Sequence, residues 1–292
     1  MNGILLVNKE KNYTSRDVVN KVGKILETKK IGHTGTLDPL ATGVLVLCVG
    51  SATKLNEILT ATYKEYVAEV TLGILTDTLD ITGNVLKEEK ENVNKEQILE
   101  TLEKMTGKYI QEVPIYSAVK VNGKKLYEYA RNGENVELPK REVDIKELEL
   151  VGDVKNIDNK IVFNIRCLVS KGTYIRALVN DIAAHLNTIG VMSELTRTKQ
   201  GRFILQDCYT LEDMENGNYK LIDIDEVLSE YPRVIVDGSK EKLISNGAII
   251  GNEWNKNEIL FIDKNDNLVA LYKTCDKDET KLKPWKMLKD NN

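Results

Sequence analysis

The sequence predicts an α+β fold, in which mainly antiparallel strands form a mixed sheet and helices flank it. Strand-like segments at residues 143–151 and 161–169 follow one another with no helix between them. Helical patterns occur elsewhere, but not in the regular strand–helix–strand order that produces a parallel sheet. The 292 residues, 41% of them hydrophobic, are enough for two domains of about 150 residues or for one large domain with an appendage.

The first quarter of the chain predicts a strand at residues 3–7 and then a helix, with Ser15 as the candidate N-cap. Residues 32–43, GHTGTLDPLATG, contain three glycines and a proline, so they cannot form regular structure throughout. The following segments predict a buried strand at 44–49, a helix from 53 to about 63, and a strand at 64–72.

The remaining elements are spaced more widely. Helices are expected at 94–105 and at about 174–186. Residues 110–141 form a basic, lightly structured excursion with one short helix near 126–131, and such long excursions are more often functional than structural. A second, small β-rich domain is expected at residues 231–292, after the first domain at residues 1–230.

The distribution of charge keeps a nucleic-acid partner possible. The formal charge is −4, which by itself argues against one. However, residues 1–64 carry nine Lys or Arg against five Asp or Glu, and residues 117–141 and 166–202 are also basic. If these windows meet in space, they form a basic face for phosphates; if they do not, they are ordinary solvated surface.

Several other classes of protein are disfavoured. The four cysteines lie far apart without a CxxC pair, so a disulfide framework or a zinc cluster is not expected. No apolar run approaches the ~18 residues that span a bilayer, and the first residues lack a secretory signal. A cytoplasmic protein without a membrane partner is expected.

The glycine-rich segment contains one carboxylate, Asp38, followed by Pro39. It lacks the Lys-Ser/Thr ending of a Walker loop and the spacing of a dinucleotide fingerprint, so a nucleotide triphosphate site is not expected. Asp38 has two interpretations. It belongs either to a simple Asp-Pro turn or to a loop that presents a nucleophilic carboxylate.

The segment Gly32–Gly43 resembles the signature of the TruB family of tRNA pseudouridine synthases, and the resemblance covers about the first 210 residues. Further family-like segments stand in the same order along the chain: Gly3-Ile4-Leu5 with Lys9 and Thr14-Ser15, Gly50–Lys54, Lys64-Glu65-Tyr66, Gly73 with Thr76–Asp80, Pro114–Lys120, Tyr127 with Ala130-Arg131, and Ser170–Arg176.

This resemblance implies a chemistry. The family breaks the bond from ribose C1′ to uracil N1, turns the base, and joins C1′ to C5. Nothing is oxidised, reduced or hydrolysed overall, so the resemblance implies no cofactor and no metal. It also implies the pseudouridine synthase fold, with an RNA-gripping insertion at about residues 110–141 and a PUA-like C-terminal domain.

The resemblance assigns three catalytic residues. Asp38 matches the catalytic carboxylate, which acts as the nucleophile on the sugar or promotes another sugar intermediate. Arg176 matches an arginine whose guanidinium favours the ionised carboxylate. Tyr66 matches an active-site tyrosine that can stack on the uracil and lie near the C5 proton. Tyr174 and Leu195 are weaker candidates that would line the pocket.

The implied substrate is the T-arm stem-loop of tRNA, modified at uridine 55. A base must leave its stack to react, and loop bases leave more readily than duplex bases. The residues expected to contact this RNA or the flipped base are His33, Thr36, Lys9, Tyr174, Leu195, Lys171, Lys120, Lys124, Lys125, Arg131 and Arg141.

The first family-like segment begins at Gly3 and the tail is short, which resembles the stand-alone bacterial members of the family more than the members that work in guide-RNA particles. No obligatory protein partner is therefore expected. The main alternative is a protein that binds and remodels tRNA without useful catalysis. The presence of Asp38, Tyr66 and Arg176 favours the enzyme, because a pure binder does not need these three residues.

Overall fold

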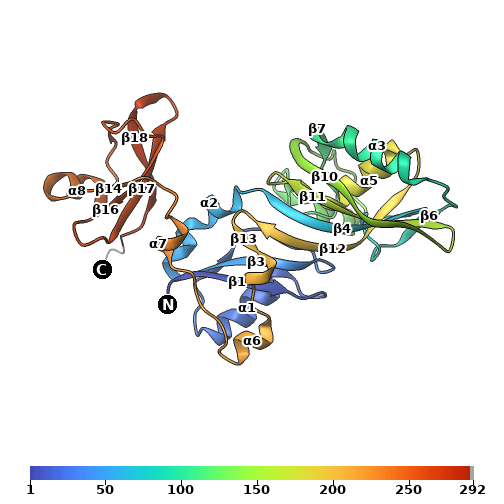
Figure 1. The fold of residues 1–292 in the computed structure, drawn as a ribbon, viewed down its shortest axis with the longest axis horizontal. Helices are drawn as coiled ribbons and strands as arrows, with labels where there is room; N and C mark the ends of the chain where they lie inside the picture. Colours follow the sequence, from blue (N-terminus) through green and yellow to red (C-terminus); the bar gives the residue numbers. More distant parts are fainter. Residues whose placement is uncertain (290–292) are drawn as a thin grey trace.

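The computed structural model describes residues 1–289, which form two main sheets (Figure 1). The larger sheet has nine strands. Its main path runs in the order β1 (Gly3–Lys9), β3 (Thr42–Val49), β12 (Gly190–Gln200), β4 (Lys64–Leu72), β11 (Lys160–Val169), β10 (Lys140–Ile157) and β7 (Gly107–Glu112), with β2 (Ile31–His33) beside β3 and β13 (Phe203–Ile204) beside β12. Neighbouring strands on this path pair antiparallel, apart from β3 and β12. The predicted α+β fold is confirmed.

The helices pack on two different parts of this sheet. Helices α1 (Ser15–Ile25) and α6 (Leu211–Glu215) bury their apolar residues against β1 and β3. Helices α3 (Lys95–Met105) and α5 (Ile175–His185) cover β4, β10, β11 and β12 at the other end, as Figure 1 shows. The sheet therefore has two halves with separate cores.

The two halves join at a short parallel pairing between β3 and β12. Only two residue pairs form it, Thr42 with Thr196 and Gly43 with Arg197. Gly43 has φ +102°, and a Cβ on it would lie 2.2 Å from the carbonyl oxygen of Arg197. This close approach requires glycine, because any side chain would separate the two strands.

The continuous apolar run at 44–49 follows from burial of β3 on both faces. Leu45, Leu47 and Val49 point into the core beneath α1 and α6. Val44, Val46 and Cys48 point into a second core, which also contains residues of the C-terminal sheet. A strand covered on both sides reads as an uninterrupted hydrophobic segment instead of an alternating one.

The second sheet, of five strands, lies near the C-terminus. Its order is β14 (Arg233–Ile235), β16 (Glu258–Ile262), β17 (Leu268–Cys275), β18 (Asp278–Met287) and β15 (Ile250–Gly251). One side packs on α8 (Gly238–Ser245), and the other contributes Leu260, Ile262 and Leu271 to the core shared with β1 and β3. The β-rich character expected for this region is confirmed; the domain boundary near residue 230 stays a prediction.

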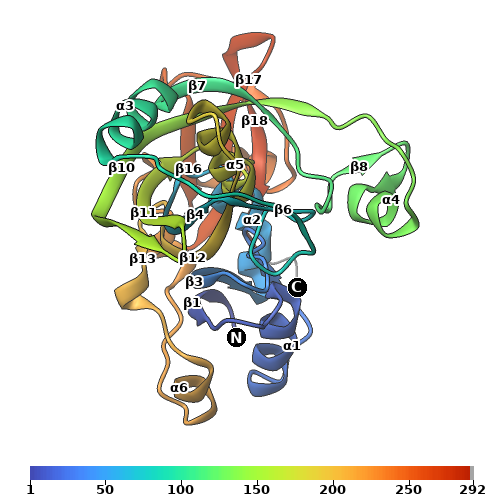
Figure 2. The ribbon, with the colours of Figure 1, turned by 90° about the vertical axis from the view of Figure 1, so that its right-hand side faces the viewer.

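Smaller elements lie in the connections. They are η1 (Gly50–Leu55), α2 (Asn56–Thr60), β5 (Ile74–Thr76), β6 (Val85–Glu88), β8 (Lys120–Val121), β9 (Lys124–Lys125), α4 (Leu126–Asn132), η2 (Leu205–Asp207) and α7 (Ile224–Val227). Figure 2 shows β8 and α4 projecting to one side of the molecule. Within residues 1–289, no helix has the length and apolar character needed to span a bilayer.

Two local predictions were wrong. The helix expected at 53–63 is a 3₁₀ turn followed by the five-residue α2. The N-cap of α1 is Thr14, whose hydroxyl accepts from the Asp17 amide, while the Asp17 carboxylate accepts from the Thr14 amide. This reciprocal capping box satisfies two backbone donors, which a cap at Ser15 would not.

Candidate active site

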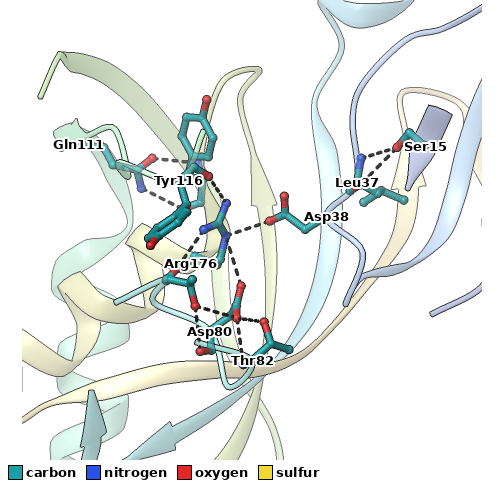
Figure 3. A network of polar contacts seen from close by, with 10 residues as sticks. Ser15, Leu37, Asp38, Asp80, Thr82, Gln111, Tyr116 and Arg176 are labelled. Atoms are coloured by element: carbon teal, nitrogen blue, oxygen red, sulfur yellow. Dashed lines mark hydrogen bonds and ion pairs between the residues drawn. The ribbon is translucent and has the colours of Figure 1, made fainter. Parts of the chain in front are cut away.

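Asp38 lies in the loop between β2 and β3, at the junction of the two halves of the sheet. The hydroxyl of Ser15, the first residue of α1, donates to the Leu37 carbonyl at 3.2 Å and accepts from the Leu37 amide at 2.8 Å (Figure 3). Leu37 itself is buried in the apolar core. Ser15 therefore anchors the residue next to Asp38, and the Asp38 side chain remains 36% exposed.

Arg176 approaches Asp38 from the opposite half of the sheet. It lies in the first turn of α5, and its Nε donates to Asp38 Oδ2 at 2.8 Å. Its Nη1 donates to the Thr78 carbonyl at 2.8 Å and its Nη2 to the Tyr116 carbonyl at 3.0 Å. Three acceptors from three segments fix the guanidinium, and only 6% of the side chain is exposed. A charge-assisted bond of this length is strong and directional.

The start of α5 is held by a buried glutamine. Gln111, on β7, accepts from the Tyr174 amide at 2.8 Å and donates to the Tyr174 carbonyl at 3.2 Å. Its side chain is fully buried. Because Tyr174 is the N-cap of α5, these two bonds fix the position from which Arg176 projects.

Asp80 is a second carboxylate beside Arg176 and was not among the predicted site residues. Its Oδ2 lies 3.9 Å from Arg176 Nε, and its side chain is 9% exposed. Its Oδ1 accepts from the Thr78 hydroxyl, the Thr82 amide and the Thr82 hydroxyl at 2.6–3.0 Å. Figure 3 shows both Asp38 and Asp80 beside the Arg176 guanidinium. The family-like segment Thr76–Asp80 was the signal for it.

The turn that carries Asp80 contains a strained backbone position. Leu79 has φ +62°, which is rare for a bulky side chain. Its carbonyl accepts from the Met192 amide at 3.2 Å, so pairing with β12 helps to hold this conformation. Strained residues of this kind gather at functional sites, where the surrounding structure enforces them. Here the turn places both the Thr78 carbonyl and the Asp80 carboxylate against Arg176.

Tyr66 lies on β4 with its side chain almost completely buried, in the same apolar core as Leu37 and Leu195. Burial raises the pKa of Tyr66 and the negative charge of Asp38 raises it further, whereas the nearby Arg197 guanidinium lowers it. The predicted trio of Asp38, Tyr66 and Arg176 therefore comes together at one place.

Lys9 does not fit the predicted RNA contact, and that prediction was wrong. Its side chain is fully buried. Its ammonium donates to the carbonyls of Tyr13 at 2.6 Å, Glu10 at 3.0 Å and Pro39 at 3.4 Å. Burial lowers the pKa of Lys9 to about 8. An ammonium with these three carbonyl partners and no exposed surface ties β1 to the Asp38 loop and cannot reach a phosphate.

The other predicted pocket residues lie around the trio. Thr36 is exposed on the Asp38 loop, and Tyr174 is half-buried beneath the Arg141 guanidinium, 5.5 Å from its ring centre. His33 is half-buried on β2; burial lowers its pKa, as do the charges of Arg197 and Arg16. The His33 imidazole is therefore neutral at pH 7. A neutral ring is compatible with the predicted contact to RNA, which requires no change of protonation.

The basic residues of the excursion lie on the projecting segment. Lys120 and Arg131 are exposed, and Lys125 lies 5.3 Å from the centre of the Tyr127 ring. Lys124 is different, because its ammonium already pairs with Glu134 at 2.6 Å. Lys171 is exposed in the turn before α5. Within residues 1–289, no three His, Cys, Asp or Glu side chains are grouped to hold a metal ion.

This geometry supplies an exposed carboxylate held by a buried guanidinium, next to a buried phenol. Comparison with known proteins agrees with it. The model of the TruB family pseudouridylate synthase N-terminal domain matches residues 23–175. The chain is similar to tRNA pseudouridine synthase B of Bacillus anthracis, with 43% identity covering 100% of this chain and 98% of that protein. A Staphylococcus aureus protein of the same name is 41% identical, covering 98% and 99%.

Solved structures show the same fold at lower identity. The crystal structure of a Cbf5–Nop10–Gar1 complex matches with a TM-score of 0.66 and 24% identity, over 93% of this chain and 78% of that one. An H/ACA RNP bound to a substrate RNA matches with a TM-score of 0.67 and 22% identity, over 99% and 85%. The family match and the full-length relatives together show that this chain is a member of the TruB family of pseudouridylate synthases.

Proposed function

We propose that this protein isomerises uridine to pseudouridine in the T-loop of tRNA, at position 55, with Asp38 as the catalytic carboxylate. The relatives named tRNA pseudouridine synthase B support tRNA as the substrate. The observation that carries the assignment of Asp38 is its 2.8 Å bond to a buried arginine while its own side chain stays partly open to solvent.

Arg176 fixes the orientation of the Asp38 carboxylate through the Nε–Oδ2 hydrogen bond. An anionic carboxylate beside a fixed cation is the form that can act on ribose C1′ as the bond to uracil N1 breaks. The guanidinium is already immobilised by the Thr78 and Tyr116 carbonyls, so little reorganisation is needed when the charge on Asp38 changes.

The target base has to leave its stack to reach Asp38, which costs a few kcal/mol and less for a loop base. We assign Leu195 and the Tyr66 ring, which share one apolar core, to line the space for this base. Once C5 has bonded to C1′, the hydrogen on C5 must leave as a proton. The phenol oxygen of Tyr66 is the group that we assign to receive it.

The decisive experiment compares wild-type protein with Asp38→Asn on unmodified tRNA and maps pseudouridine chemically. We expect turnover to be abolished in the variant, while tRNA affinity stays within about tenfold, equivalent to roughly 1.4 kcal/mol. Replacing the target uridine by cytidine is the control for position. Absence of pseudouridine with wild-type protein would favour a tRNA-binding protein without catalysis, and a large loss of affinity in Asp38→Asn would show that Asp38 holds the loop together.

A further inference from the structure

Arg197 is a buried cation that directly faces Tyr66. The two residues are opposite each other in the antiparallel pairing of β12 with β4. Directly opposed residues place their side chains on the same face of a sheet, with Cβ atoms about 5 Å apart. Arg197 is fully buried and is the largest side chain in the structure with so little exposure.

The guanidinium of Arg197 is held by backbone oxygens. Its Nε donates to the Val44 carbonyl at 2.6 Å and its Nη2 to the Gly35 carbonyl at 3.2 Å. Gly35 lies in the loop that carries Asp38, and Val44 lies in β3, the strand that follows this loop. No carboxylate in the part of the chain that the structure describes lies within ion-pair distance of Arg197. Burying a charge without an opposite charge costs several kcal/mol, so a purely structural role would be better filled by an apolar side chain.

The backbone of Arg197 is fixed as well. The pairing of β12 with β4 shifts register between Arg197 and Lys199, and such bulges often orient a side chain beside an active site. On the other edge of β12, Gly43 packs directly against the Arg197 main chain. The cation is therefore held in place between the Asp38 loop and the Tyr66 phenol.

We infer that Arg197 is a positioning residue for the reaction: it holds the Tyr66 side chain and stabilises its phenolate while the C5 proton is removed. This inference rests on the proposed function. In the product, N1 carries a hydrogen that uridine lacks, and C5 has lost one. Tyr66 gives its phenolic proton to the uracil ring, which ends with a hydrogen at N1, and the phenolate then takes the proton from C5. Tyr66 is a phenol again at the end, so protons balance without a co-reactant.

The surroundings of Tyr66 show why a cation is needed. Burial and the anionic Asp38 both raise the pKa of Tyr66, so each opposes a phenolate. The charge of Arg197 lowers that pKa. Arg197 is thus the group on this face that favours the ionised phenol next to a catalytic carboxylate of the same sign.

The test uses Arg197→Gln, which keeps an amide donor but removes the charge, and Arg197→Lys, which keeps the charge but not the planar fork. Single-turnover rates are measured on tRNA that carries either uridine or C5-deuterated uridine at the target position. We expect Arg197→Gln to slow the reaction by about tenfold to hundredfold, within the range of general acid–base effects, and to enlarge the deuterium isotope effect. Arg197→Lys should also slow the reaction and enlarge the isotope effect, but by less than Arg197→Gln does.

Lys64→Met is the matched control. Lys64 is also a buried cation near this site, but its ammonium donates to the Thr60 and Thr62 carbonyls, not to Tyr66. Its loss should leave the isotope effect at the wild-type value. An unchanged isotope effect in Arg197→Gln would overturn the inference, whatever happens to the rate. If Arg197→Gln does not fold, a wild-type isotope effect in Arg197→Lys overturns it. Lack of pseudouridine with wild-type protein would instead refute the proposed function.

Discussion

Asp80 is the second carboxylate beside Arg176, and we expect its effect on the reaction to be indirect. Its Oδ2 lies 3.9 Å from Arg176 Nε, the same nitrogen that donates to Asp38 at 2.8 Å, so two anions share one edge of the guanidinium. Removing one anion leaves Arg176 paired more tightly with the other. Asp80 therefore belongs to the positioning of Asp38, although it is nearly buried and its remaining oxygen is used within its own turn.

We expect Asp80→Asn to reduce the single-turnover rate by about hundredfold, which is typical when one preorganised electrostatic interaction is removed, and to leave the tRNA dissociation constant nearly unchanged. The control is Asp77→Asn in the same turn, because Asp77 is bonded to Asn84 and has no contact with Arg176. Equal rates for the two variants would show that Asp80 is only a turn residue.

His33 makes the stability of the protein sensitive to mild acid. Burial lowers the pKa of His33 in the folded state. Below the ordinary pKa of 6.5, the unfolded chain therefore binds a proton at His33 more readily than the folded chain does, and this difference favours unfolding. Stability contributed by neutral His33 is thus present above pH 6.5 and is lost as pH falls. Urea denaturation at pH 7.5 and 5.5 should show a larger loss for wild type than for His33→Gln, by at most about 1.4 kcal/mol per pH unit. Identical losses of stability in wild type and His33→Gln would show that His33 does not cause the sensitivity to acid.

At the scale of elements, α4 and the β8–β9 hairpin carry several of the basic residues that we expect to contact RNA. The segment projects from the molecule and carries Lys120, Lys125 and Arg131. The sequence identified its charge but could not show that Lys124 is paired with Glu134, because the partner lies ten residues away in a loop. A neutralised lysine contributes less to phosphate binding than a free one.

We therefore expect Lys125→Ala with Arg131→Ala to weaken tRNA binding and to flatten its salt dependence. The log–log slope should fall by about 0.7 to 0.9 for each phosphate that the variant no longer neutralises. Lys124→Ala is the matched control and should change the slope less. Binding measured between 50 and 200 mM salt gives a slope for each of the three proteins, and equal slopes would remove α4 from the interface.

The sequence predicts elements better than it predicts their ends. Strand β4 lies at 64–72 as expected, because its residues alternate between buried and half-buried over most of its length. The end of the helix near Tyr63 was wrong, because Thr62 and Tyr63 instead enter the turn that receives the Gly201 amide. The burial of Lys9 could not be predicted either. A lysine next to charged neighbours reads as surface until the carbonyls of Tyr13 and Pro39 are seen around it.

At the scale of the whole molecule, the C-terminal sheet supports the catalytic part through a shared core. Leu260, Ile262 and Leu271 cover Ile4, Leu6 and Val44 from outside. Lys286 also pairs with Glu57 across the same interface at 2.6 Å. The chemistry and the C-terminal sheet are therefore linked by packing as well as by the chain.

Truncation after Glu230 should lower the free energy of unfolding by at least about 2 kcal/mol, the value of re-exposing one large aliphatic side chain. The melting temperature should fall by about 4–8 °C, because each kcal/mol corresponds to about 2–4 °C in a chain of this size. Leu271→Asp in the full-length protein should reproduce most of this loss, because it disrupts the same core. A truncated protein with an unchanged melting temperature would show that the two sheets are energetically independent.

The short parallel pairing between β3 and β12 has a consequence for a chain that is only partly folded. Asp38 belongs to the half of the sheet on one side of this pairing, and Arg176, Asp80 and Tyr66 belong to the half on the other side. A nascent or damaged chain with only one side folded would present a lone aspartate or a lone arginine, and neither could attack a nucleoside. A chain in which the two sides have not come together lacks the Asp38–Arg176 pair on which the proposed reaction depends.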